Sequence, residues 1–122
     1  MPLTVDITRK PNGICVVKLY GRLDTTTYGR LESQLDPLLQ ASTKALIFDM
    51  AELSYISSMG LRTILAARKA IEGHGNTLVI TNLQPQIAKV FEIAKALPNE
   101  RVFSSVEEAD RYLTAMQERE RA

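Results

Sequence analysis

A strand, helix, strand unit in the middle of the chain is the feature that most restricts its fold. Residues 45–50 form a short, uninterrupted apolar run, which is typical of a central strand covered on both faces. After a loop expected at residues 51–56, residues 58–72 place apolar side chains at helical spacing. Residues 73–76 supply the glycines that end a helix, and residues 77–81 are rich in strand-forming residues. This order predicts a βαβ unit, and therefore an α/β fold.

The residues before this unit add a hairpin and a helix. Residues 3–9 alternate apolar and polar side chains, and a Pro-Asn-Gly turn separates them from an apolar run at residues 14–20. This pattern predicts an opening β-hairpin. Leucines at helical spacing predict a helix over residues 25–40, which Pro37 is expected to kink or break near Asp36.

The residues after the unit predict three more elements. Residues 84–96 are helix-periodic, residues 102–103 form a brief strand, and a serine at position 104 or 105 caps a last helix through residue 116. We expect the charged end at residues 116–122 to fray. The whole chain, 1–122, is therefore predicted to be one domain with a mixed sheet of about five strands and about four helices packed against it.

Composition excludes several classes of function. Fifteen Lys and Arg residues against fourteen Asp and Glu residues give a net charge of +1, so the chain lacks the basic surface of a direct nucleic-acid binder. No segment approaches the roughly 18 apolar residues that a membrane span requires. The single cysteine, Cys15, lies in an apolar run and is interpreted as a buried thiol in a reducing compartment. A cytoplasmic protein is the expectation.

Candidate catalytic groups are scarce. The one histidine, His74, lies between two glycines at a helix end, and we interpret it as a surface-loop residue. One Cys and one His without ligand spacing provide no metal site, and no nucleotide-binding motif is present, so no cofactor is expected. A carboxylate pair formed by Asp24 and Asp49 is the only enzymatic alternative, and no nucleophile or base accompanies it.

The stretch from residue 49 to residue 62 is the most informative part of the chain. It runs from the end of the buried strand into the first turn of a helix that begins at Ser57 and Ser58. Serine is among the best N-cap residues, so from physics alone capping is the favoured interpretation. The functional interpretation is a phosphorylation site, because a phosphate at a helix N-terminus meets free N–H groups and the positive end of the helix dipole.

Here the sequence resembles the STAS domain of anti-sigma factor antagonists. In that family a strand ending in Asp precedes a loop and an Asp-Ser-x-Gly-Leu helix start, which matches residues 49–61. Residues 21–24 resemble the family's Gly-x-Leu-Asp after the second strand, and the element order agrees over nearly the whole chain. The family's usual Asp is here Ser57, so two adjacent hydroxyls replace an acid and a hydroxyl.

The resemblance implies that Ser58 is phosphorylated by an anti-sigma factor that is also a serine kinase, with Ser57 as the alternative acceptor. It implies a non-enzymatic partner switch: the unmodified chain binds the kinase and frees the client that the kinase holds, and phosphorylation ends that binding. A metal-dependent serine phosphatase is implied as the partner that resets the switch. The predicted partner-binding residues are Asp24, Thr25, Ser57, Ser58, Met59, Gly60 and Arg62.

Two of these residues carry open alternatives. Met59 either adds apolar contact area to the partner surface or packs within the helix. Asp24 either caps its own helix, which is the preferred interpretation, or contacts the kinase. The alternative for the whole chain is a STAS subunit of a larger assembly, such as a lipid transporter or signalling complex, in which the serines serve only as caps.

Overall fold

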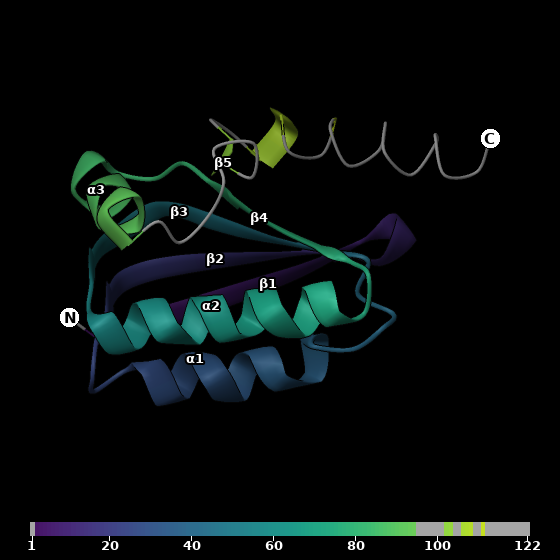
Figure 1. Cartoon of the computed structure of the whole chain (residues 1–122), viewed down its shortest axis with the longest axis horizontal. Coiled ribbons are helices and arrows are strands. Elements are labelled where there is room, and N and C mark those ends of the chain that lie inside the picture. The colour runs from purple at the N-terminus through teal and green to yellow at the C-terminus, as the bar shows by residue number, and fades with distance from the viewer. Residues whose placement is uncertain (1, 95–101, 104–105, 109–110, 112–122) are drawn as a thin grey trace.

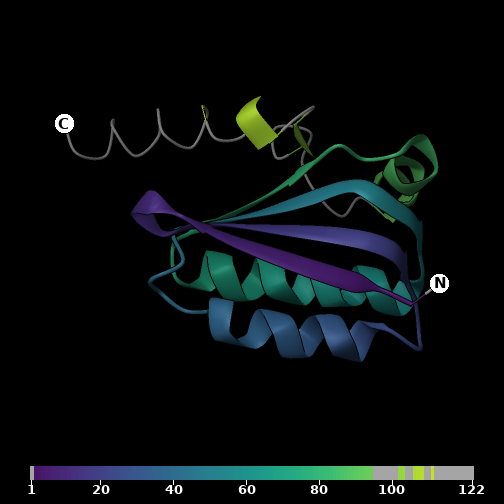
Figure 2. The same cartoon turned by 180° about the vertical axis from the view of Figure 1, so that it is seen from behind.

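The molecule is built on a central β-sheet, with helices packed against it. The computed structural model describes residues 2–94, 102–103, 106–108 and 111. Figures 1 and 2 show the helices α1 and α2 side by side across one face of the sheet, with their N-terminal ends at the same end of the molecule. The helix α3 lies toward that same end. This arrangement confirms the predicted α/β class.

The sheet formed by the described residues has five strands in the order β1-β2-β3-β4-β5. β1 (Thr4–Lys10) is antiparallel to β2 (Ile14–Leu23), and β2 is parallel to β3 (Ala45–Ile56). β4 (Thr77–Thr81) is parallel to β3, and the short β5 (Val102–Phe103) is parallel to β4. The predicted opening hairpin, the mixed sheet of about five strands and the central position of the apolar run are all confirmed.

β3 continues well beyond the apolar run that predicts it. The prediction of a loop at residues 51–56 is wrong, because β3 pairs with β2 as far as the pair Leu23 and Ile56. Two register irregularities between β2 and β3, each with one extra residue on β3, let the paired strands bend. Leu53 and Ile56 are buried along this extension. The two residues between them are exposed, so the sequence shows neither the alternation nor the continuous apolar run that predicts a strand.

The first helix is shorter than its leucine spacing predicts. α1 (Tyr28–Leu35) begins three residues later than the expected start, because residues 24–27 form a turn instead. It is followed by the 3₁₀ segment η2 (Asp36–Leu38). The predicted break near Asp36 is therefore confirmed, as Pro37 cannot donate the backbone hydrogen bond that would continue the α-helix.

The second helix, α2 (Ser58–Gly73), matches its prediction to within one residue. Gly75 follows it with a φ of 78°, the left-handed conformation that favours glycine after a helix end. His74 is exposed in this segment, as expected. α3 (Pro85–Ala94) agrees with the predicted third helix over the described residues.

Burial places the larger core between the sheet and the helices α1 and α2. Leucines of α1, isoleucines of α2 and alternate residues of β2 and β3 form one buried cluster, which also includes Cys15. A smaller cluster covers the opposite face of the sheet, where Val106 packs against it. Of the last predicted helix, the structure describes only residues 106–108 and 111, which are helical. The predicted tail at residues 116–122 lies outside the described residues.

Candidate functional site

The candidate site lies where the end of β2 meets the start of α2. The Ser57 N–H donates to the Leu23 carbonyl oxygen at 2.9 Å, which ties the helix start to the strand end. Gly60 is buried against the same residue: a Cβ atom placed on it would lie 2.7 Å from Leu23 Cγ. Only glycine allows this approach without a shift, so the first turn of α2 sits directly on the strand.

The two adjacent serines have different roles at this helix start. Ser57 is the N-cap, with an extended backbone and a side-chain oxygen that accepts the Gly60 N–H at 3.1 Å. Ser58 is the first helical residue and is exposed. Its hydroxyl forms no hydrogen bond within the described part of the chain. The capping function expected of one serine is therefore performed by Ser57, and the Ser58 hydroxyl is available to solvent.

A turn at Asp24 borders the helix start. The Asp24 carboxylate accepts the Thr26 hydroxyl at 2.7 Å and the Thr26 N–H at 2.9 Å. These two hydrogen bonds hold the pKa of Asp24 below its ordinary value, with a smaller contribution from the charge of Arg22. α1 has Thr27 at its N-cap position, so Asp24 caps the preceding turn and not the helix itself. Thr25 is exposed at the tip of this turn.

Sequence reasoning missed a pair of residues beside this turn. The Arg22 guanidinium stacks on the Tyr55 ring at 4.0 Å from the ring centroid, and its Nε lies 3.7 Å from an Asp24 carboxylate oxygen. Among the described residues, Tyr55 is the one large hydrophobic side chain that is exposed. Its pairing with Arg22 depends on the register between β2 and β3, and residue 55 falls in the stretch predicted to be a loop.

Three other predicted site residues lie on α2. Met59 is half-buried, and its carbonyl accepts the Thr63 hydroxyl at 3.1 Å. Arg62 is exposed, whereas Gly60 is buried. The structure thus brings Ser58, Met59 and Arg62 together on the first two turns and gives Gly60 a packing role.

The carboxylate pair considered as an enzymatic alternative does not form. Asp49 is buried and accepts the Ala51 N–H and the Asn82 side-chain amide, both at 3.1 Å. In the sheet, Asp49 of β3 lies opposite Lys18 of β2, and Asp24 follows Lys18 by six residues along the chain. At about 3.3 Å per residue, the two carboxylates are separated by about 15–20 Å. Each acts as a hydrogen-bond acceptor in its own surroundings, Asp24 in the turn after β2 and Asp49 within β3.

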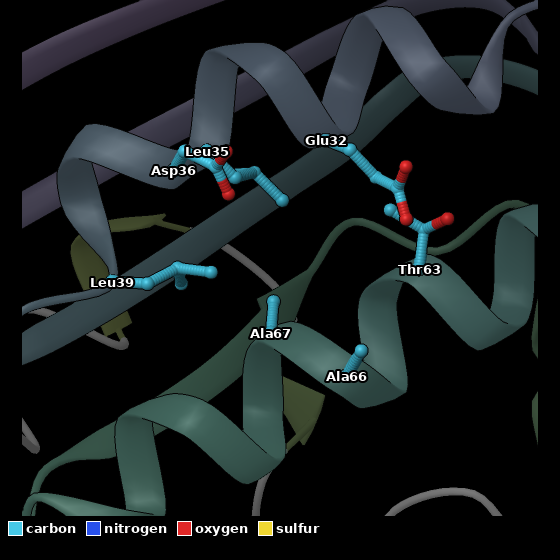
Figure 3. Close-up of a pocket in the computed structure, with 7 residues that line it drawn as sticks. All are labelled: Glu32, Leu35, Asp36, Leu39, Thr63, Ala66 and Ala67. Carbon is cyan, nitrogen blue, oxygen red and sulfur yellow. The ribbon is translucent and has the colours of Figure 1, made fainter.

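A groove of about 300 Å³ separates α1 from α2. Figure 3 shows its lining, with apolar side chains from both helices and the Glu32 carboxylate pointing toward Thr63. Among the residues that the structure describes, no group of three His, Cys, Asp or Glu side chains is placed to hold a metal ion. No described helix is long and apolar enough to cross a membrane.

Comparisons with known proteins match this architecture. The STAS domain family model matches residues 7–109. A Bordetella bronchiseptica protein that bears the name anti-sigma factor antagonist BtrV is 32% identical over 94 residues, which cover 77% of this chain and 78% of BtrV. The anti-sigma-B factor antagonist of Staphylococcus aureus is 32% identical over 77 residues, which cover 63% of this chain and 71% of that protein.

A solved structure supports the same assignment of the fold. The Bacillus cell fate determinant SpoIIAA in its phosphorylated form superposes with a TM-score of 0.75 at 19% identity, covering 90% of this chain and 99% of SpoIIAA. The family model spans most of the chain, and the sheet and helices share the fold of that solved structure. The chain therefore belongs to the STAS domain family.

Proposed function

We propose that this chain is an anti-sigma factor antagonist that works as a phosphorylation-controlled partner switch. The names of its relatives in Bordetella bronchiseptica and Staphylococcus aureus support the general role. The unphosphorylated chain binds a serine-kinase anti-sigma factor and releases the client that this kinase holds. Phosphorylation of Ser58 ends the binding. The role needs no catalytic residue in this chain, and the relatives carry the names of regulators.

The observation that carries the proposal is the different use of the two serines. Ser57 accepts the Gly60 N–H and so contributes to the fold, while Ser58 is exposed and makes no hydrogen bond within the described residues. A kinase reaches an exposed hydroxyl without opening the helix. The Ser58 oxygen attacks the γ-phosphorus of ATP, ADP leaves, and the hydroxyl proton is lost. We therefore propose Ser58 as the acceptor in preference to Ser57.

The surface around Ser58 suits a protein partner. Arg62, one helical turn after Ser58, is exposed, Met59 is half-buried, and Thr25 is exposed in the turn that follows β2. Asp24 is held in place by its turn, which fixes the shape of this border. Gly60 is buried, and its contribution is to let the first turn of α2 pack on the strand.

Phosphorylation changes the charge at the centre of this surface. A phosphoserine adds about 1.5–2 negative charges at neutral pH. Burying such a charge unpaired in an interface costs about 2–5 kcal/mol, which lowers affinity about 30-fold to several thousandfold. This range is large enough for a switch. A metal-dependent serine phosphatase completes the proposed cycle, and the cytoplasm, where the buried thiol of Cys15 stays reduced, is its proposed location.

The test compares three variants for binding to the serine-kinase anti-sigma factors of the source genome, measured by calorimetry with and without ATP. Ser58→Ala is expected to bind whether or not ATP is present, and Ser58→Asp to bind at least tenfold more weakly. Ser57→Ala, the matched control, is expected to remain a substrate for the kinase. Equal affinity of the Ser58→Ala and Ser58→Asp variants would refute the switch.

The substitutions at Ser58 also distinguish the proposed switch from the alternative, a constitutive STAS subunit of a larger assembly. That alternative predicts a stable partner complex, recovered from cells, that is unaffected by any substitution at Ser58. Intact-mass and peptide mass spectrometry of the native protein adds a direct readout, because the proposed switch requires a phosphate on Ser58 in at least one growth condition.

A further inference from the structure

Arg62 lies one helical turn after Ser58, and both residues are exposed on α2. The first turn of α2 contains no acidic residue, and Arg62 forms no ion pair with any carboxylate in the described part of the chain. Ser57, by contrast, has its side chain engaged by the Gly60 N–H. A guanidinium without a carboxylate partner among the described residues therefore lies one helical turn from the proposed phosphate acceptor, and the proposed switch gives it a role only before phosphorylation, in binding the partner.

The geometry of a helix brings these two side chains together. Residues four positions apart are neighbours on the helix surface, with Cβ atoms about 5–6 Å apart. Long side chains in helices also lean toward the N-terminus, so Arg62 covers the surface over the preceding turn, where Ser58 lies. Guanidinium groups bind phosphates through charge-assisted hydrogen bonds that are stronger than neutral ones.

We propose that Arg62 binds the phosphate of phosphorylated Ser58 within the same helix. This inference rests on the acceptor named in the proposed function and adds a mechanism to its regulation. Before modification, Ser58 and Arg62 together carry a charge of +1; afterwards they carry about −0.5 to −1. Phosphorylation thus reverses the sign of the charge on this pair of residues and also withdraws Arg62 from the partner.

The neighbouring charged groups define the controls. On α1, which packs beside α2, Glu32 points toward Thr63 (Figure 3), and among the described residues it forms no ion pair with Arg62. Arg22 is engaged by Tyr55 and Asp24 at the end of β2. Lys69 is the exposed cation further along α2, about 16 Å from Ser58 along the helix axis, and is therefore out of reach.

The experiment places phosphoserine at position 58 during translation, so that no kinase is required. The second ionisation of the phosphate is then titrated by ³¹P NMR in the otherwise unchanged chain and in the variants Arg62→Gln and Lys69→Gln. Removing Arg62 is expected to raise the phosphate pKa by about 0.2–0.4 unit, since a pair at this spacing is a modest interaction. Lys69→Gln is expected to leave it unchanged.

Identical phosphate pKa values with and without Arg62 would overturn the inference. Far-UV circular dichroism of each variant shows that α2 is intact, and Arg62→Lys is expected to retain part of the shift. The failure of this inference and the failure of the proposed function are distinguishable: if no kinase modifies Ser58, the switch fails, while the phosphate titration still reports on Arg62.

Discussion

Gly60 in α2 faces Leu23 at the end of β2 so closely that a Cβ atom on Gly60 would lie 2.8 Å from the Leu23 carbonyl oxygen. That oxygen also accepts the Ser57 N–H at 2.9 Å. The helix start is therefore held against the strand by one hydrogen bond and by the absence of a side chain. Because Ser58 follows the bonded residue directly, the position of its hydroxyl depends on this contact.

Gly60→Ala is expected to destabilise the protein by about 1–3 kcal/mol, since the added methyl group meets backbone as well as side-chain atoms of Leu23. Urea denaturation measures the change. Gly73→Ala is the matched control in the same helix, because a Cβ atom there meets nothing within 4 Å. It is expected to be neutral or stabilising by up to about 1 kcal/mol. Equal effects of the two substitutions would contradict the close approach.

The two serines are expected to differ in their effect on stability. Ser57→Ala removes the oxygen that accepts the Gly60 N–H, which costs about 1 kcal/mol, the usual effect of losing an N-cap. Ser58→Ala removes an exposed hydroxyl and is expected to change the free energy of unfolding by less than about 0.5 kcal/mol. Chemical denaturation of both variants provides the measurement. A larger loss for Ser58→Ala would show that the capping assignment is reversed.

The order of strands and helices could be predicted from the sequence, because the hydrophobic periodicity of the βαβ unit is visible within each short stretch of residues. The sequence was insufficient for the second half of β3, where exposed Glu52, Ser54 and Tyr55 interrupt the apolar pattern. Those residues remain in the strand because β2 pairs with them through Leu23 and Ile56. Such a partner lies some 30 residues away in sequence and leaves no local signal.

In the candidate site, too, some features could be predicted from the sequence and others could not. A serine at the start of α2 was predictable from helix capping, but two adjacent serines have the same intrinsic preference for that position. Only the extended backbone of Ser57, with φ −95° and ψ 173°, decides which of them caps and which is exposed. The Arg22 and Tyr55 stack was not predictable, since it requires the register of two parallel strands.

Asp24 is expected to make the stability of the turn before α1 depend on acid. Its folded pKa is below the ordinary value of 3.8, so its contribution is fully present above that value and is lost as the pH falls through the folded pKa. Asp24→Asn removes this dependence. The difference in unfolding free energy between the two proteins is therefore expected to shrink between pH 6 and pH 2, as measured by urea denaturation.

The substitution Thr26→Ala tests independently what lowers the pKa of Asp24. The Thr26 hydroxyl donates to Asp24 at 2.7 Å and is the largest contributor to its lowered pKa. Removing it is expected to move the Asp24 pKa toward its ordinary value in an NMR titration, although the Thr26 N–H still donates. An unchanged Asp24 pKa in this variant would assign the effect to other groups.

Tyr55 and Arg22 are expected to contact the partner beside Ser58. An exposed aromatic ring held by a stacked guanidinium is a rigid surface of the kind that dominates protein interfaces, where truncation of such a residue commonly costs about 1–2 kcal/mol. Tyr55→Ala is therefore expected to weaken binding of the proposed partner, a serine-kinase anti-sigma factor, about 5- to 30-fold in calorimetry. Tyr55→Phe keeps the ring and the stack and is expected to bind within about threefold of the unchanged chain. If Tyr55→Ala binds as tightly as Tyr55→Phe, the partner does not use the ring, and the contact surface is limited to the turn at Asp24 and the first two turns of α2.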